Sequence, residues 1–241
     1  MTSSHHPTTS TVENYLKSLY VHQQNAAERL VPLGRLAQAL EVTPGTVTTM
    51  VKGLAEAGYA EYEARRGARL TETGEILALQ VLRRHRLIEL FLVEVMGYDW
   101  SEVHDDAEVL EHAVSDQLLE RIDIMLGHPT VDPHGDPIPQ ASGRIDRQEL
   151  QPLSLATVGW HEIARIMDHA PQFLCFLQER GLTPGAAVHV IERNEVAEIV
   201  RLEAPSREAV IVSMAAAARI LVPAPHADST ARSTPPAPPD A

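Results

Sequence analysis

Residues 33–71 read LGRLAQALEVTPGTVTTMVKGLAEAGYAEYEARRGARLT, and this stretch decides the fold of the N-terminal part of the chain. The first eight residues carry leucines and an alanine at helical spacing, which predicts a short helix. The EVTPG run after it predicts a tight turn. Thr43 can cap the next helix and Pro44 suits its first position, so a second helix is predicted over about residues 44–57.

The residues after this second helix predict a two-stranded wing. Gly58 ends the helix, and residues 59–63 (YAEYE) alternate as a strand does. A turn at residues 65–67 (RRG) leads into a return strand over residues 68–71. A short helix, a tight turn, a second helix and a two-stranded wing together predict a winged helix-turn-helix.

The second helix and the wing tip carry short polar and basic side chains that suit base edges and phosphates. The candidate DNA-contacting residues are Thr43, Thr46, Thr48, Thr49, Lys52, Arg65 and Arg66, with Arg69 beside them in the wing. Winged helices also serve as protein-docking modules. Arginines at the wing of an otherwise acidic chain nevertheless favour double-stranded DNA as the partner.

The next part of the chain is rich in potential metal ligands. They are His104, Glu108, Glu111 and His112 in one run, and His85 and Glu89 in the apolar segment before it. In a helix, these spacings put the side chains of each group on neighbouring parts of one face. Of the formal charge of -13, -11 lies in residues 71–140, and divalent cations would offset part of this repulsion. A solvated acidic helix surface accounts for some of these charges.

The remaining histidines have no partner pattern. We expect His22, His128, His134, His161, His189 and His226 to be ordinary surface or loop residues. His5 and His6 lie in a polar N-terminal segment.

Three further helices are predicted in the N-terminal half. Thr11 can cap the first of them, and two longer helices are predicted over about residues 72–96 and 101–126. The 72–96 helix is apolar over most of its circumference, so it needs a second partner. In a small regulator this partner is often another copy of the chain, which predicts a homodimer.

The predicted fold is mainly α with a C-terminal all-β domain. Prolines and glycines interrupt residues 127–150, which predicts a linker. The β domain, at residues 151–222, is predicted to be a small barrel with strands at about 158–167, 186–193, 197–203 and 208–212 and a helix near 170–180. The other predicted parts are a disordered segment at residues 1–10, the winged helix at 11–72, the ligand-bearing helices at 73–126 and a flexible tail at 223–241.

Composition and missing motifs narrow the function. No apolar run is long enough to cross a membrane, and a signal-peptide pattern is lacking. Cys175 is the only cysteine, which excludes an intrachain disulfide and favours the cytoplasm; its apolar surroundings predict an inert core thiol. Because no nucleotide loop, nucleophile elbow or HExxH motif is present, neither an enzyme nor a small-molecule substrate is expected. A metalloenzyme and a metal-independent winged-helix regulator are the alternatives.

In this order of parts, the chain resembles the diphtheria toxin repressor family of metal-dependent transcription regulators, in its manganese-responsive, three-domain branch. The resemblance is carried by VENYL (12–16), RHRLIE (84–89), VHDDAEVLEHAVSD (103–116) and DPHGDPIP (132–139), and it is weak in the barrel. It implies a helical metal-binding and dimerisation domain and a Src-homology-3-like (FeoA-type) β-barrel. It also implies a homodimeric repressor that binds a palindromic operator and controls metal-uptake genes.

The resemblance further implies two metal sites. The first site takes Glu108, Glu111 and His112 together with Asn14 from the N-terminal helix. The second takes His85, Glu89 and His104, completed by a barrel residue, for which Asp168 is preferred to His169 or Gln172.

Departures from the family pattern bear on the metal. Iron-responsive members have Cys where this chain has Glu108, whereas manganese-responsive members have Glu. Oxygen and imidazole ligands suit Mn(II) better than a set that includes a thiolate, so Mn(II) is expected, with Fe(II) as the alternative. Lys17 stands where some manganese sensors have Glu, which argues against a closely spaced binuclear site, and Asn14 supplies a neutral oxygen.

Overall fold

The computed structural model describes residues 8–24, 29–203 and 209–225, which fall into two compact units. The first unit comprises Met1–Ile88, Asp106–His128 and Ile138–Ile145, and the second comprises Glu89–Asp105, Pro129–Pro137 and Asp146–Ala241. The predicted disordered ends lie mostly outside the described residues. The predicted domain boundaries stay a prediction.

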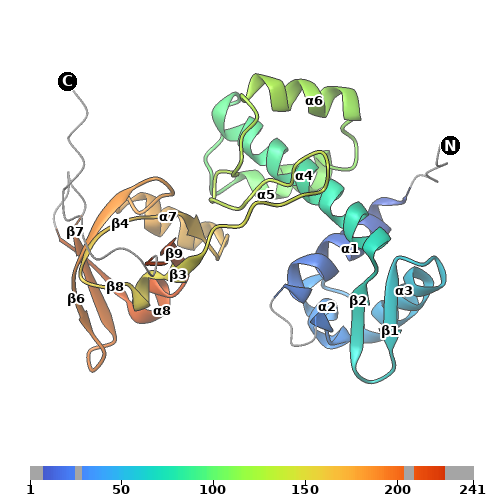
Figure 1. Ribbon diagram of the computed structural model, residues 1–241, viewed down its shortest axis with the longest axis horizontal. Helices are drawn as coiled ribbons and strands as arrows, with labels where there is room; N and C mark the ends of the chain where they lie inside the picture. The colour runs from blue at the N-terminus through green and yellow to red at the C-terminus, as the bar shows by residue number, and fades with distance from the viewer. Residues whose placement is uncertain (1–7, 25–28, 204–208, 226–241) are drawn as a thin grey trace. The chain divides into compact units, whose positions relative to one another are not determined.

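The N-terminal part is a winged helix-turn-helix, as predicted (Figure 1). Its helices are α1 (Ser10–Gln23), α2 (Leu33–Ala39) and α3 (Pro44–Glu56), and its wing is the antiparallel pair β1 (Ala60–Glu63) and β2 (Gly67–Leu70). The side chain of Thr43 accepts a hydrogen bond from the Thr46 amide and Pro44 begins α3, both as predicted. The three helices and the wing share one apolar core, which includes Leu16, Val47 and Leu54.

The predicted cap of α1 is wrong by two residues. The cap is Thr9, whose side chain accepts a hydrogen bond from the Val12 amide. A threonine can cap a helix by accepting a hydrogen bond from the amide three residues later, and both Thr9 and Thr11 have such an amide. Local sequence alone therefore does not choose between the two threonines.

The predicted helix over residues 72–96 is α4 (Glu72–Glu94), but the predicted helix over residues 101–126 is divided. Its two parts are α5 (Val103–Leu110) and α6 (Asp116–Met125). Ser115 caps α6 by accepting a hydrogen bond from the Leu118 amide at 3.3 Å. The sequence prediction overlooked this cap signal, and the break puts Glu111 and His112 in a turn that follows α5.

The second unit contains two antiparallel sheets around one apolar core. Strands β3 (Leu150–Pro152), β9 (Ile220–Pro223) and β5 (Arg165–Ile166) form one sheet, in that order. Strands β4 (Gly159–Glu162), β6 (Ala187–Asn194), β7 (Ile199–Glu203) and β8 (Val210–Ser213) form the other. Helices α7 (Pro171–Gln178) and α8 (Met214–Ala217) complete this sheet-rich domain. The predicted 158–167 strand is two strands, and β3, β9 and α8 were not predicted.

Cys175 is exposed, so the prediction of a core thiol is wrong. Helix α7 buries Leu174 and Leu177, whereas Cys175 on the same helix is exposed. The Cys175 Sγ lies 3.5 Å from the Ser101 Oγ, within the second unit. Among the described residues, no helix has the length and apolar character that crossing a membrane requires.

Candidate functional site

The polar face of helix α1 lies against the residues after α4 that were predicted to bind metal. We call the side chains that meet there the Glu111 cluster, which comprises Asn14, Lys17, His85, Glu108, Glu111 and His112. The Lys17 Nζ donates to Glu108 Oε1 at 2.7 Å and to the two carboxylate oxygens of Glu111 at 2.7 and 2.8 Å. Because Asn14 and Lys17 lie one turn apart on α1, both face the same cluster.

Glu111 is the buried centre of this cluster, with 0 % of its side chain exposed. Its second carboxylate oxygen lies 2.6 Å from His85 Nδ1. Burial alone would raise the pKa of the Glu111 carboxyl, but the hydrogen bond to His85 and the charge of Lys17 outweigh burial, so its pKa lies below the usual value. Atoms of His85, Glu108 and Glu111 lie close enough together to hold a metal ion.

His112 is held from both sides by residues of α1. Its Nε2 lies 2.7 Å from Asn14 Oδ1 and 3.4 Å from Glu111 Oε1, so three of the four residues predicted for the first metal site contact one another, and Lys17 links the fourth, Glu108, to Glu111. Its Nδ1 lies 2.7 Å from a carboxylate oxygen of Glu13. A carboxylate on the far nitrogen is the usual way in which proteins orient a metal-binding histidine.

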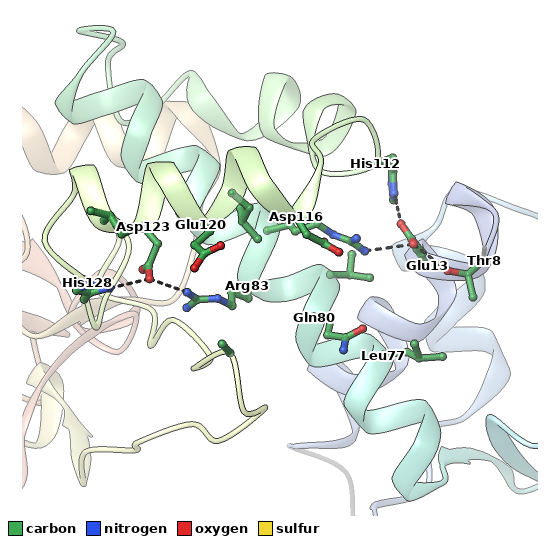
Figure 2. A pocket seen from close by; sticks show the side chains of 15 residues that line it. Thr8, Glu13, Leu77, Gln80, Arg83, His112, Asp116, Glu120, Asp123 and His128 are labelled. Carbon is green, nitrogen blue, oxygen red and sulfur yellow. Dashed lines mark hydrogen bonds and ion pairs between the residues drawn. The ribbon is translucent and has the colours of Figure 1, made fainter. Parts of the chain in front are cut away.

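Glu13 was not among the predicted residues, although it stands next to Asn14 in the VENYL run. Its other oxygen accepts from Thr8 Oγ1 at 2.8 Å and from Arg84 at 3.2 Å. The pair of Glu13 and His112 borders a cavity of about 920 Å³ lined by α4, α6 and the start of α1 (Figure 2).

A second group of potential metal ligands lies in the second unit. This Glu89 cluster comprises Glu89, His104, Asp132 and His134. His104 Nδ1 lies 3.2 Å from Glu89 Oε1, and one atom each of Glu89, Asp132 and His134 lie within 4.8 Å of one another. Glu89 and His134 are each 1 % exposed and Asp132 is 4 % exposed.

The tautomer of His134 shows that this cluster fits a cation. Its Nε2 lies 2.9 Å from the Trp100 carbonyl oxygen, so Nε2 carries the proton and Nδ1 carries a lone pair. This buried Nδ1 has no hydrogen-bond partner and lies 3.9 Å from Glu89 Oε2. Burial, followed by the nearby His169, lowers the pKa of the His134 imidazole. A neutral imidazole lone pair facing two buried carboxylates is a donor set that a divalent cation would satisfy.

His134 was expected to be an ordinary surface or loop residue, and it is not a surface residue. It stacks on His169, with 4.2 Å between the ring centres, and on Trp100. A buried turn produces this placement, because Asp132 Oδ1 accepts from the amides of His134 and Asp136 at 2.8 and 2.9 Å. The Asp-Pro-His-Gly-Asp run is the sequence signal for such a turn.

Two other residues were predicted for the second site, namely His85 and Asp168. His85 lies in the first unit, one helical turn before Glu89 on α4. Asp168 accepts from the Ala170 amide at 3.0 Å and from Arg219 at 2.5 Å. His169, the weaker candidate, lies 3.2 Å from Asp136. Burial alone would lower the pKa of His169, but its hydrogen bond to Asp136 outweighs burial and raises it.

The predicted DNA-contacting residues lie on α3 and on the wing, where most of them are exposed. Thr48 and Thr49 donate their hydroxyl protons to the backbone carbonyls of Pro44 and Gly45. In this state these two hydroxyls can accept hydrogen bonds but do not offer a donor. Arg65 is exposed at the wing turn, and Arg66 pairs with Glu63 at 2.5 Å.

Comparison with known proteins gives two family matches. Residues 7–68 match the model of the iron dependent repressor N-terminal DNA binding domain, and residues 71–140 match that of the iron dependent repressor metal binding and dimerisation domain. The diphtheria toxin repressor of Corynebacterium diphtheriae is 35 % identical over 199 residues, which are 76 % of this chain and 85 % of the repressor. The iron-dependent repressor IdeR of Mycobacterium tuberculosis is 38 % identical over 130 residues, 54 % of this chain and 55 % of IdeR, so this match spans about half of that relative.

The matches to solved structures cover more of this chain than the sequence matches do. A manganese-dependent transcriptional repressor in complex with manganese is 38 % identical, with a TM-score of 0.80, and the match covers 88 % of this chain and 99 % of that one. The manganese regulator SloR is 32 % identical, with a TM-score of 0.69, and the match covers 88 % and 97 % of the two chains.

Proposed function

This chain belongs to the iron-dependent repressor family, which includes the diphtheria toxin repressors, and from this premise we propose that it is a metal-dependent repressor of transcription. The observation that carries the proposal is that α1, a helix of the winged helix-turn-helix, supplies Asn14 and Lys17 to the Glu111 cluster. Metal bound in this cluster would therefore act on the winged helix-turn-helix through α1. The names of the relatives favour regulation over the alternative of a metalloenzyme, and a DNA-bound role favours the cytoplasm.

We assign the metal ligands by what each residue contacts. Asn14, Glu108, Glu111 and His112 would hold one cation in the Glu111 cluster. Glu89, His104, Asp132 and His134 would hold another in the Glu89 cluster. The predicted ligand Asp168 would join the second site only by leaving Arg219. When bound, the cation supplies positive charge and directed bonds to these ligands.

The residues of the first site explain how metal would control DNA binding. Asn14 and His112 join α1 to the turn after α5, so cross-linking them fixes the winged helix against the metal-binding region. In a dimer this narrows the range of distances between two copies of α3 toward the spacing of two major-groove segments. To shift the ratio of DNA-binding to non-binding conformations from 1:99 to 99:1, the metal must bind the DNA-binding conformation about 5.5 kcal/mol more tightly than the other. Divalent sites can supply this difference.

Exposed apolar side chains support the homodimer. Val109 is 70 % exposed, Leu118 is 51 % exposed and Met125 is 66 % exposed, all on α5 and α6. Apolar surface of this kind is commonly covered by a partner, and a closed two-fold dimer suits a palindromic operator. Double-stranded DNA and a second copy of the chain are thus the partners we propose.

The function is tested by gel shift on DNA selected from random sequences, with Mn(II) or with a chelator. We expect binding in Mn(II) and its loss in chelator. Equal binding in both would contradict metal control and favour a metal-independent winged-helix regulator.

Replacing Glu108 by Cys should move metal selectivity from Mn(II) toward Fe(II). The thiolate that it introduces is a softer ligand than the carboxylate, so the ratio of Mn(II) to Fe(II) affinity should fall by roughly tenfold. Competition with a metal indicator under anaerobic conditions measures this ratio. Asp106→Cys, at an exposed position on the same helix, is the control and should leave the ratio unchanged. An unchanged ratio in Glu108→Cys would show that residue 108 does not set selectivity.

Replacing Arg65 by Ala should weaken DNA binding without changing sequence preference. Because the variant removes one phosphate-binding charge from the wing, the slope of log K against log salt should fall by about 1. Fluorescence anisotropy across a salt series measures the slope for two unrelated operators. Arg201→Ala, at an exposed position on β7, is the control. A change in sequence preference would instead indicate base contacts by Arg65.

A further inference from the structure

The Lys17 ammonium contacts the carboxylate oxygens that would bind a cation in the Glu111 cluster. An ammonium group has three N–H donors, and three carboxylate oxygens of Glu108 and Glu111 lie within 2.7–2.8 Å of the Lys17 Nζ. These two carboxylates, with His85, are also a group that could hold a metal ion. The ammonium and a divalent cation therefore compete for the same oxygen lone pairs.

The surroundings of Lys17 make this competition strong. The Lys17 side chain is 12 % exposed and that of Glu111 is 0 % exposed, so water screens their interaction only weakly. Glu108 and Glu111 together carry two negative charges, and Lys17 neutralises one of them. A divalent cation bound beside the retained ammonium would be repelled at a distance of a few ångströms.

We propose that Lys17 is the resident cation of the metal-free Glu111 cluster, and that metal binding there is an exchange in which the ammonium leaves Glu108 and Glu111. This inference rests on the proposed function. The exchange raises the metal concentration at which the site fills, so Lys17 sets the threshold of the sensor. It also changes how α1 is held, because the contacts of Lys17 with Glu108 and Glu111 are lost while Asn14, one turn earlier on the helix, stays beside His112.

Substitution of Lys17 tests the exchange through metal affinity. Lys17→Met keeps an unbranched side chain and removes the charge, and it should tighten Mn(II) binding by about tenfold or more in calorimetric titration, each factor of ten being about 1.4 kcal/mol. Lys17→Arg keeps the charge, so its Mn(II) binding should remain as weak as that of the unaltered chain. Equal or weaker Mn(II) binding by Lys17→Met than by the unaltered chain would overturn the exchange.

Loss of Lys17 leaves the buried Glu111 with one partner fewer, which destabilises the variant. A second measurement therefore uses the unaltered protein. Lys17 and Lys52 are the lysines of this chain, and Lys52 lies exposed on α3. Acetylation followed by mass spectrometry therefore reports on Lys17 with a built-in control. Lys17 should be protected in chelator and modified faster in Mn(II), whereas Lys52 should react equally in both.

The outcomes separate this inference from the proposed function. If Mn(II) binds and activates DNA binding while Lys17 stays protected, the exchange is wrong and the function stands. If Mn(II) binds to neither the unaltered chain nor Lys17→Met, the function and the exchange fail together. Release of Lys17 by Mn(II) without any effect on DNA binding supports the exchange and contradicts the function.

Discussion

Glu111→Gln should abolish metal-dependent DNA binding and should also destabilise the metal-free protein by about 3 kcal/mol. Glutamine keeps the size of the side chain but removes the charge that Lys17 contacts at both oxygens and His85 at one of them. The Lys17 ammonium would keep Glu108 as its remaining carboxylate partner within the cluster. Both effects have one cause, because Glu111 is at once a proposed metal ligand and a buried counter-charge.

The two effects are measured separately. Denaturant unfolding in chelator gives the change in free energy of unfolding, and calorimetric titration with Mn(II) gives the change in metal binding. Glu120→Gln, at an exposed position on α6, removes the same charge away from the cluster and should alter neither. Preserved stability together with abolished metal binding would mean that the ion pair between Lys17 and Glu111 does not stabilise the metal-free protein.

The acid dependence of this variant follows from the lowered pKa of Glu111. A carboxyl whose folded pKa lies below its unfolded value stabilises the fold above the unfolded pKa, near 4.5, and this stabilisation is lost as the pH falls through the folded pKa. In chelator, the unaltered protein should therefore lose stability below about pH 4.5, and the Glu111→Gln variant should lose less.

The sequence predicted those parts of the fold that depend on local rules. Thr43 and Pro44 begin α3 as predicted, because capping and the fixed φ of proline act within a few residues. The spacing of Glu108, Glu111 and His112 predicted a cluster, although the helix ends before Glu111. Pairing between distant strands is different: β3 pairs with β9 from the far end of the domain, and no local pattern indicates that partner.

The parts of the site that were missed depend on tertiary contacts. His134 is a potential metal ligand because the Trp100 carbonyl fixes its tautomer and because Glu89, which is distant in sequence, lies near its free nitrogen lone pair. The role of Glu13 depends on His112, also distant in sequence. Residue type and spacing identify potential ligands, but they do not indicate which hydrogen bonds leave a nitrogen lone pair without a partner.

Gly135→Ala should abolish the metal binding proposed for the Glu89 cluster and lower the free energy of unfolding by about 3 kcal/mol or more. Gly135 has a φ of +84°, and an added Cβ would lie 2.0 Å from the Ala164 carbonyl oxygen. That backbone cannot yield easily, because the adjoining β5 is paired with β9 and the Ile166 amide donates to the His134 carbonyl at 2.8 Å. The turn that carries Asp132 and His134 would have to move instead.

Gly143→Ala separates the clash from the backbone strain. Gly143 has a φ of +81°, nearly the same as Gly135, but an added Cβ would meet nothing within 4 Å. Gly143→Ala should therefore cost only about 1 kcal/mol from the left-handed backbone and should leave metal binding unchanged. Denaturant unfolding and metal analysis after gel filtration compare the two variants. Equal losses would mean that φ alone decides the outcome, whereas loss of metal in Gly135→Ala alone ties the Glu89 cluster to the contact with Ala164.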